Sequence, residues 1–204
     1  FTGLEGHGSA PDLGVNAAKY AVRFVAQLME LREHLKNRAP TDSRFEPPWT
    51  TLSVGRISGG VAHNVIVGKA EVDWEMRPVQ AADLAFVNDN MQQSIHDTLI
   101  PAMRQVYPAA NISTEIIAEI CGLDSMPENA ARQLVSELTG ANSADLVAFG
   151  TEAGLFQGLG LSAVVCGPGS ITQAHKPDEY VALDQLSACL EMLTGLGRKL
   201  HGAA

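Results

Sequence analysis

Apolar residues recur along the chain with two different periods, and the changes between them predict helices and strands. Apolar positions three or four residues apart predict three long helices. One follows an N-cap at Asn16 and runs to about Lys36, one covers 81–106, and one covers 184–200. Because Pro101 lacks a backbone N–H, we expect it to kink or interrupt the second of these helices.

Alternating apolar and polar residues predict the strands of the first half. Residues 50–56 and 70–76 alternate and predict two half-buried strands. Residues 111–120 are strand-like as well, and residues 1–5 look like the end of another strand, shortened where this chain begins. The order β-α-β-β-α-β predicts an α+β, ferredoxin-like layer in which helices cover an antiparallel sheet.

The second half has a different pattern. Short apolar runs alternate with helical patterns, in the order 127–138 (helix), 145–149 (strand), 151–159 (helix) and 162–166 (strand). Continuous apolar strands between helices are typical of a sheet that is covered on both faces. We therefore expect two domains, an α+β domain over 1–120 and part of an α/β domain over 121–204.

The composition of the chain limits which kinds of partner it can bind and indicates the cell compartment in which it works. The 204 residues are 46% hydrophobic and 18% charged, which is typical of a globular protein. A formal charge of −9 argues against nucleic acid as a partner, and no apolar run reaches the ~20 residues of a membrane helix. Three widely spaced cysteines without a CxxC pair favour the reducing cytoplasm. Since the chain begins at Phe1 without Met, we expect it to be cut from a longer one.

Two histidines lie in positions that suit chemistry. His175 follows an apolar strand in a loop rich in Gly and Pro, where an imidazole could bind a metal or carry a proton. His7 lies in a turn flanked by glycines, where it could stabilise an oxyanion. Plainer interpretations remain open: His175 as a loop residue bonded to backbone, and His7 as part of a turn whose glycines serve only geometry.

Two further groups could bind charged parts of a substrate. We expect Asn64 and Arg77 at neighbouring strand ends, where an Arg fork could pair with a carboxylate. Gly150, Thr151 and Glu152 link a strand to a helix, so that Thr151 can cap the helix and Glu152 can pair with a substrate ammonium. The alternatives are a solvated Arg77 with Asn64 as a turn residue, and an ordinary acidic first helical turn at Glu152.

These residues do not make a complete active site. The sequence contains no HxD or HExxH metal motif, no adjacent Glu-Glu pair, and no GxSxG of a serine hydrolase. It contains neither GxGxxG nor a phosphate-binding P-loop. The residues alone therefore leave the reaction open.

Five segments together resemble the metal-dependent aminoacylase and carboxypeptidase family, which includes acetylornithine deacetylases, succinyl-diaminopimelate desuccinylases and glutamate carboxypeptidases. The matching segments occur in the family's order and cover nearly the whole chain: GHGSAP (6–11), GGVAHNVI (59–66), DWEMR (73–77), FGTEA (149–153), and CGPG (166–169) with HKPDEYV (175–181). The resemblance implies an α/β catalytic domain of zinc-peptidase type with two zinc or cobalt ions, and a ferredoxin-like lid that forms a homodimer.

The resemblance also implies roles for the candidate residues. His175 would be a terminal metal ligand, and His7 would reach from the lid into the partner subunit's site and polarise the scissile carbonyl. Asn64 and Arg77 would hold the substrate carboxylate. Gly150 would line the same pocket, and Thr151 lies beside it. For Glu152 we hypothesise a contact with the side-chain ammonium of ornithine.

Within the family, the segments around Glu152 and His175 are most similar to acetylornithine deacetylase. The expected function is therefore the hydrolysis of N2-acetyl-L-ornithine to L-ornithine and acetate, a step of arginine biosynthesis. Alternatives are a related N-acyl-amino-acid hydrolase, a desuccinylase, a dipeptidase, or a non-catalytic dimerisation or ligand-binding module. The family's other metal ligands and its general base would precede Phe1, so we expect the isolated chain to be inactive.

Overall fold

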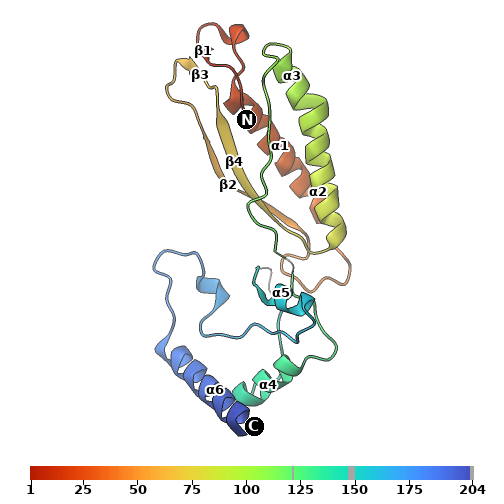
Figure 1. Cartoon of the computed structure of the whole chain (residues 1–204), viewed down its shortest axis with the longest axis vertical. Coiled ribbons are helices and arrows are strands. Elements are labelled where there is room, and N and C mark those ends of the chain that lie inside the picture. The colour runs from red at the N-terminus through yellow and green to blue at the C-terminus, as the bar shows by residue number, and fades with distance from the viewer. Residues whose placement is uncertain (121, 147–149, 203–204) are drawn as a thin grey trace. The chain divides into compact units, whose positions relative to one another are not determined.

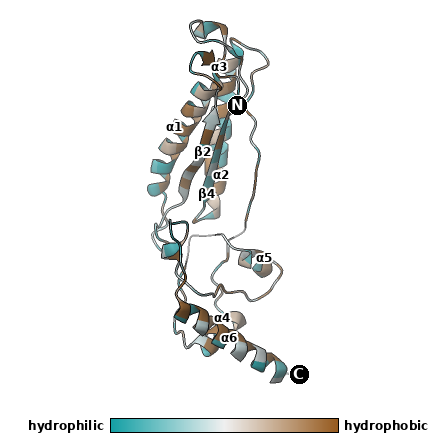
Figure 2. Cartoon of the chain, turned by 90° about the vertical axis from the view of Figure 1, so that its left-hand side faces the viewer, coloured by the Kyte–Doolittle hydropathy of each residue, from teal (hydrophilic) through white to brown (hydrophobic). Residues whose placement is uncertain are grey.

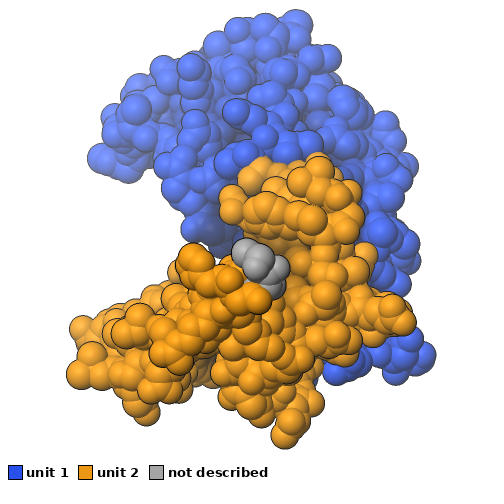
Figure 3. Space-filling view, turned by 60° about the horizontal axis from the view of Figure 1, so that its bottom comes forward, with its two compact units in different colours: residues 1–117, 146–149 blue, residues 118–145, 150–204 orange. Residues whose placement is uncertain are grey.

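The structure is a computed structural model that describes residues 1–120, 122–146 and 150–202 (Figure 1). The chain divides into two compact units. Unit 1 comprises residues 1–117 and 146–149, and unit 2 comprises residues 118–145 and 150–204 (Figure 3).

Unit 1 is built from two long helices that lie along a β-hairpin (Figure 1). The helices are α1 (Ala17–Lys36) and α2 (Ala81–Ser94), and the hairpin consists of β2 (Thr51–Gly59) and β4 (Ala70–Arg77). Their apolar faces form one core, whose fully buried members include Leu28, Leu35, Val87, Leu99 and Met103. The predicted helix after Asn16 and the two alternating strands are thus confirmed.

The start of α1 and the interruption of the second helix both follow from local chemistry. The Asn16 side chain accepts a hydrogen bond from the Lys19 N–H at 3.1 Å, which confirms it as the N-cap. After α2 comes a π-helical turn (Ile95–Leu99), and then α3 (Ile100–Arg104). Pro101 cannot donate to the carbonyl four residues earlier, and the regular helix is interrupted in that turn, as expected.

The strands form two small antiparallel sheets rather than one continuous layer. β1 (Gly6–His7) pairs with β3 (Val65–Ile66), and β2 pairs with β4, with a bulge between Val54 and Arg56. On the outer face of the hairpin, Arg56 bonds Glu71 at 2.7 Å and Asp73 at 2.8 Å. The core side of this sheet carries the apolar residues, so the hairpin has one apolar and one charged face.

The strands predicted at 1–5 and 111–120 are largely absent in the described residues. Thr2 makes isolated bridges to Lys69 and Asn111, and residues 113–120 are exposed and have no regular secondary structure. The bridge from Thr2 to Asn111 is antiparallel, and continuing its register would pair 113–120 with residues before Phe1. Residues 113–120 therefore have no strand partner among the described residues.

Unit 2 contains three helices: α4 (Ala130–Thr139), α5 (Ala153–Gly158) and α6 (Leu183–Gly202). The Asn129 side chain caps α4, and Gly140 ends it in the left-handed conformation (φ 73°). α4 packs against α6, where the Lys199 ammonium bonds the Glu137 carboxylate. The three helices predicted in this half are therefore confirmed, with bounds shifted by a few residues.

Neither of the two strands predicted in unit 2 is confirmed by the described residues. Residues 162–166 are irregular, so that prediction is wrong for this structure, and the strand predicted at 145–149 extends over 147–149, outside the described residues. A buried strand needs neighbouring strands on both sides for its backbone hydrogen bonds. The described part of unit 2 contains no other strand that could supply them.

Many apolar side chains of unit 2 are exposed. Figure 2 shows apolar residues along α4 and α6. Leu159 is 78% exposed, Leu183 79% and Leu190 67%. None of the residues of α6 is buried, although its sequence is amphipathic. Although α4 packs against it, α6 therefore keeps apolar side chains that are exposed.

Candidate functional site

His7 is held in a defined hydrogen-bonding state. It lies in β1, opposite Val65, with an exposed side chain. The Ser9 backbone N–H donates to its Nδ1 at 3.2 Å, and the Ser9 hydroxyl lies 2.7 Å from the same nitrogen. A backbone amide can only donate, so Nδ1 is the acceptor and Nε2 carries the proton of the neutral ring. His7 thus presents an N–H donor to solvent.

Asn64 lies beside His7 because two backbone segments approach closely. The Gly8 N–H donates to the Asn64 carbonyl at 2.7 Å. A Cβ atom on Gly8 would come within 2.8 Å of the same oxygen, so glycine is what permits the contact. The structure therefore brings together His7 and Asn64, two of the predicted site residues.

Arg77 lies at the other end of the hairpin. In the β2–β4 ladder, Gly59 pairs with Ala70 and Thr51 pairs with Arg77. Ala70 and Arg77 are the two ends of β4, about 23 Å apart at ~3.3 Å per residue. The expectation that Asn64 and Arg77 lie at neighbouring strand ends is therefore wrong within one chain, because the full length of β4 separates them.

The Arg77 guanidinium is already oriented by a neighbour on its own strand. Its Nε and one terminal nitrogen each lie 3.1 Å from a carboxylate oxygen of Glu75. The arginine side chain is 41% exposed. The charge of the Arg77 guanidinium is thus partly neutralised by Glu75. A ligand that binds this guanidinium must share its N–H donors with the Glu75 carboxylate.

Three polar residues near Arg77 were missed from the sequence. Asp83, which is 1% exposed, accepts hydrogen bonds from Thr50 at 2.6 Å and from Arg38 at 3.0 Å. A sequence signal for Asp83 existed, because it shares one face of α2 with the buried Val87 and Met91, at intervals of four residues. Nothing comparable marked Thr50 or Arg38.

The segment Gly150-Thr151-Glu152 precedes α5. The Thr151 hydroxyl accepts a hydrogen bond from the Ala153 N–H at 3.2 Å, but the N-cap of α5 is Glu152, so Thr151 precedes the cap instead of forming it. Glu152 is exposed and makes no side-chain capping bond, so its carboxylate is available to a ligand. Gly150 faces Ile120, whose Cδ1 would lie 3.6 Å from an added Cβ.

His175 lies in an irregular loop of unit 2 with an unusual backbone. Its φ is 59° and that of Asp178 is 58°, and its backbone N–H donates to the Glu179 carboxylate at 3.1 Å. Among the residues that the structure describes, no three His, Cys, Asp or Glu side chains are grouped to hold a metal ion. One imidazole cannot form a zinc shell, so the described chain does not by itself fit a metal centre.

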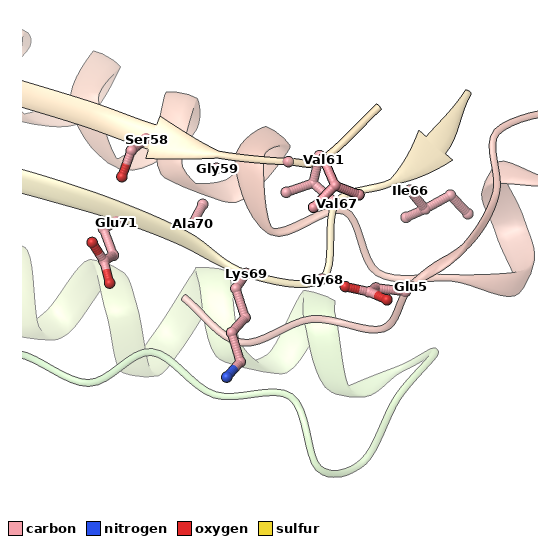
Figure 4. Close-up of a pocket in the computed structure, with 11 residues that line it drawn as sticks. Glu5, Ser58, Gly59, Val61, Ile66, Val67, Gly68, Lys69, Ala70 and Glu71 are labelled. Atoms are coloured by element: carbon pink, nitrogen blue, oxygen red, sulfur yellow. The ribbon is translucent and has the colours of Figure 1, made fainter. Parts of the chain in front are cut away.

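Two pockets, one in each unit, do not gather the predicted residues. A pocket of 340 Å³ in unit 1 is lined by Glu5, Lys69, Glu71 and neighbouring segments (Figure 4). Figure 4 shows the Lys69 side chain extending away from the Glu5 carboxylate, so these two charged groups do not converge. A second pocket of 390 Å³ lies within unit 2, and Thr151 is the one predicted residue among those that line it.

Comparison with known proteins identifies the family. Residues 1–102 match the peptidase dimerisation domain of M20 peptidases, and residues 69–199 match the peptidase family M20/M25/M40. The chain therefore belongs to this family of hydrolases.

Similar proteins narrow the comparison further. The chain is 34% identical to an acetylornithine deacetylase of Myxococcus xanthus and 33% identical to one of Salmonella heidelberg, over 94% of its own length in each case. It spans about half of these curated relatives, 48% of each. The family resemblance inferred from the sequence is thereby confirmed.

Solved structures agree with the fold. An aminopeptidase PepT of Bacillus cereus superposes with a TM-score of 0.60 at 18% identity, and a tripeptidase of Staphylococcus aureus with 0.61 at 17%. The matches cover 94% of this chain and 48% and 47% of those chains. At this identity they show the α+β fold of M20 peptidases. Within the described residues, no helix is both long and apolar enough to cross a membrane.

Proposed function

We propose that this chain is part of a metal-dependent amidohydrolase that converts N2-acetyl-L-ornithine to L-ornithine and acetate, a reaction of arginine biosynthesis. The observation that carries the proposal is the one-third identity to acetylornithine deacetylases over 94% of the chain. The complete protein would then contain about as many residues again, and it would include the groups that this chain lacks.

Unit 1 would be the core of a ferredoxin-like lid. Phe1 and Ala70 exchange backbone hydrogen bonds on one side (2.9 and 3.1 Å), and Thr2 and Asn111 exchange them on the other (2.8 and 3.0 Å). In the complete protein, residues leading into Phe1 would continue this strand between β4 and 113–120. The lid would then cover 1–120, and residues 121–204 would belong to the catalytic α/β domain.

The separation of His7 and Asn64 from Arg77 supports a homodimer. A bound carboxylate cannot reach both ends of β4, which are about 23 Å apart. We place His7 and Asn64 of one subunit at the site of its partner, and Arg77 at the site of its own subunit. The Nε2–H of His7 would then donate to the oxygen of the scissile carbonyl, where negative charge develops.

The segment before α5 would complete substrate binding. Gly150 and Thr151 would line the pocket, and the exposed Glu152 carboxylate would bind the side-chain ammonium of ornithine. Arg77 would bind the substrate's carboxylate through its guanidinium fork. The substrate carries one positive and one negative group. The acidic Glu152 would bind the ammonium and the basic Arg77 the carboxylate, so both residues would contact one small zwitterion.

The metal site would be shared between this chain and the rest of the complete protein. His175 would supply one ligand to zinc or cobalt, and the other ligands would lie outside the described residues. Without them the isolated chain would be inactive. The free thiols Cys166 and Cys189 fit a cytoplasmic protein.

A second candidate comes from another class of function. Because residues 1–102 match a dimerisation domain, the chain could act as a dimerisation or ligand-binding module without catalysis. Related hydrolytic activities, on other N-acyl amino acids, succinylated substrates or dipeptides, are alternatives within the family.

Turnover by the complete polypeptide separates these candidates. With zinc or cobalt, we expect it to hydrolyse N2-acetyl-L-ornithine with a higher kcat/KM than N-acetylglutamate, succinyl-diaminopimelate or a dipeptide. A higher kcat/KM for one of the latter three would make that compound the substrate in place of N2-acetyl-L-ornithine. If none of the four is hydrolysed in the presence of metal, the result favours the non-catalytic module.

A further inference from the structure

A buried polar cluster lies in unit 1 at the end of the hairpin that carries Arg77. At its centre is the carboxylate of Asp83, which is 1% exposed, next to the hydroxyl of Thr50, which is 0% exposed. Besides Thr50 and Arg38, the Gln80 side-chain amide also donates to Asp83, at 3.1 Å. Charged groups are rarely buried without such partners, because removal from water is costly unless hydrogen bonds replace it.

The cluster ties down the backbone that follows Arg77. The Val79 N–H donates to the Thr50 hydroxyl at 3.0 Å, and that hydroxyl in turn donates to Asp83. The Gln80 amide bridges Asp83 and the Arg38 carbonyl, each at 3.1 Å. The connection from β4 to α2 is therefore bonded to Asp83 at Gln80 directly and at Val79 through Thr50.

The cluster also fixes the strand opposite Arg77. Thr51 is the ladder partner of Arg77, and Thr50 precedes it directly. Arg38, the ionic partner of Asp83, lies with its guanidinium carbon 4.1 Å from the centre of the Phe86 ring, so it is held by stacking as well as by charge. Both backbone segments that flank Arg77 thus converge on one buried carboxylate.

We propose that Asp83 is a positioning residue for Arg77, which sets where the guanidinium fork meets the substrate's carboxylate. The inference rests on the proposed function of Arg77. A bidentate contact tolerates little displacement, since binding groups must be held within about 0.5 Å of their working geometry. Loss of the Asp83 charge would release Thr50 and Val79 and let the end of β4 move, although Asp83 itself touches no substrate.

The test is a set of variants of the complete enzyme with two substrates. One is N2-acetyl-L-ornithine, and the other is N-acetyl-1,4-diaminobutane, which lacks the carboxylate. For Asp83→Asn we expect KM for acetylornithine to rise about tenfold with kcat nearly unchanged, on the scale of one charge-assisted hydrogen bond. For the decarboxylated substrate we expect a change of less than about twofold.

A double-mutant cycle shows whether the effect passes through Arg77. In an Arg77→Ala background, Asp83→Asn should change KM by less than about twofold, because the group it positions is gone. Gln80→Ala removes two bonds of the cluster at a less buried position, and it should shift KM in the same direction by about threefold without loss of folding. Glu33→Gln, which removes an exposed charge on α1, is the matched control and should change neither substrate's KM.

Three results would overturn the inference in distinguishable ways. If Arg77→Ala weakens acetylornithine selectively but Asp83→Asn and Gln80→Ala weaken both substrates equally, Asp83 acts on stability alone. If the effects of Asp83→Asn and Arg77→Ala simply add, Asp83 does not act through Arg77. If Arg77→Ala itself does not discriminate between the substrates, the proposed function of Arg77 fails first, and the inference fails with it.

Discussion

At the scale of single residues, the contact between Gly8 and Asn64 determines whether the His7 end of unit 1 can form. The contact leaves no room for a side chain, since a Cβ on Gly8 would lie 2.8 Å from the Asn64 carbonyl oxygen. This short distance is what places Asn64 beside His7.

We therefore expect Gly8→Ala to destabilise unit 1 by about 1–3 kcal/mol, the usual cost of forcing atoms into a packed site. Chemical denaturation followed by far-UV circular dichroism measures it. Gly55→Ala is the control, because its Cβ would meet no atom closer than 3.8 Å. Equal stability of the two variants would mean that the Gly8 contact is not formed in solution.

A second prediction for a single residue concerns Glu152 and the substrate specificity of the complete enzyme. Its exposed carboxylate has no capping role, so its proposed use is to bind a substrate ammonium. In the complete enzyme, Glu152→Gln should lower kcat/KM for N2-acetyl-L-ornithine about tenfold, the worth of one charge-assisted contact. N-acetylnorvaline, which lacks the ammonium, should be affected less than about twofold. Equal losses for both substrates would remove this role from Glu152.

At the scale of elements, unit 1 offers two backbone edges, one on β4 and one at Asn111, with which the same added strand could pair. The antiparallel registers set by Phe1 with Ala70 and by Thr2 with Asn111 both continue past Phe1. Phe1 packs edge-on against Phe24, with ring centres 5.6 Å apart, so alternate residues before Phe1 would face α1. Partial burial lowers the pKa of the Phe1 α-ammonium, while nearby Glu71 acts in the opposite direction.

An added strand should therefore order residues 113–120. We expect a six-residue extension before Phe1, with valine at the second, fourth and sixth positions before it and threonine between, to protect the amides of residues 113, 115 and 117 from hydrogen exchange. NMR detects this protection residue by residue. The same extension with proline in place of threonine is the control, because proline cannot donate to a ladder. Unchanged exchange with the valine-threonine extension would contradict the proposed lid.

The helices were predicted from the sequence far better than the strands and the site. Helices depend on nearby residues, so the apolar spacing and the Asn16 cap were sufficient for α1. The strands predicted at 111–120 and 162–166 depend on distant backbone partners, which sequence patterns do not reveal. The same limit explains the error at Arg77, because its distance from Asn64 follows from the length and register of the whole hairpin.

At the scale of the whole molecule, the exposed apolar side chains of unit 2 should drive association. Large apolar patches on soluble proteins mark surfaces that are covered by other protein. If the proposed function holds, the remainder of the proposed α/β domain covers α6 and the segment around Leu159 in the longer protein. In the isolated chain, a second copy is available to cover them.

We expect the isolated chain to form assemblies larger than a dimer, measured by light scattering after size-exclusion chromatography. Leu190→Glu, at a position that is 67% exposed on α6, should reduce the mass toward that of a dimer. Val106→Glu places the same charge at a 46% exposed apolar position of unit 1 and should leave the larger assembly intact. A monodisperse monomer of the unmodified chain would contradict this expectation.

The most direct test of the account is complementation between two inactive variants of the complete enzyme. If His7 serves the partner's site and His175 serves its own, a mixed dimer of His7→Ala and His175→Ala subunits contains one intact site. After unfolding and refolding an equal mixture, random pairing predicts about a quarter of the unmodified activity toward N2-acetyl-L-ornithine. No recovery of hydrolysis, from a mixture shown to contain the mixed dimer, would contradict the account.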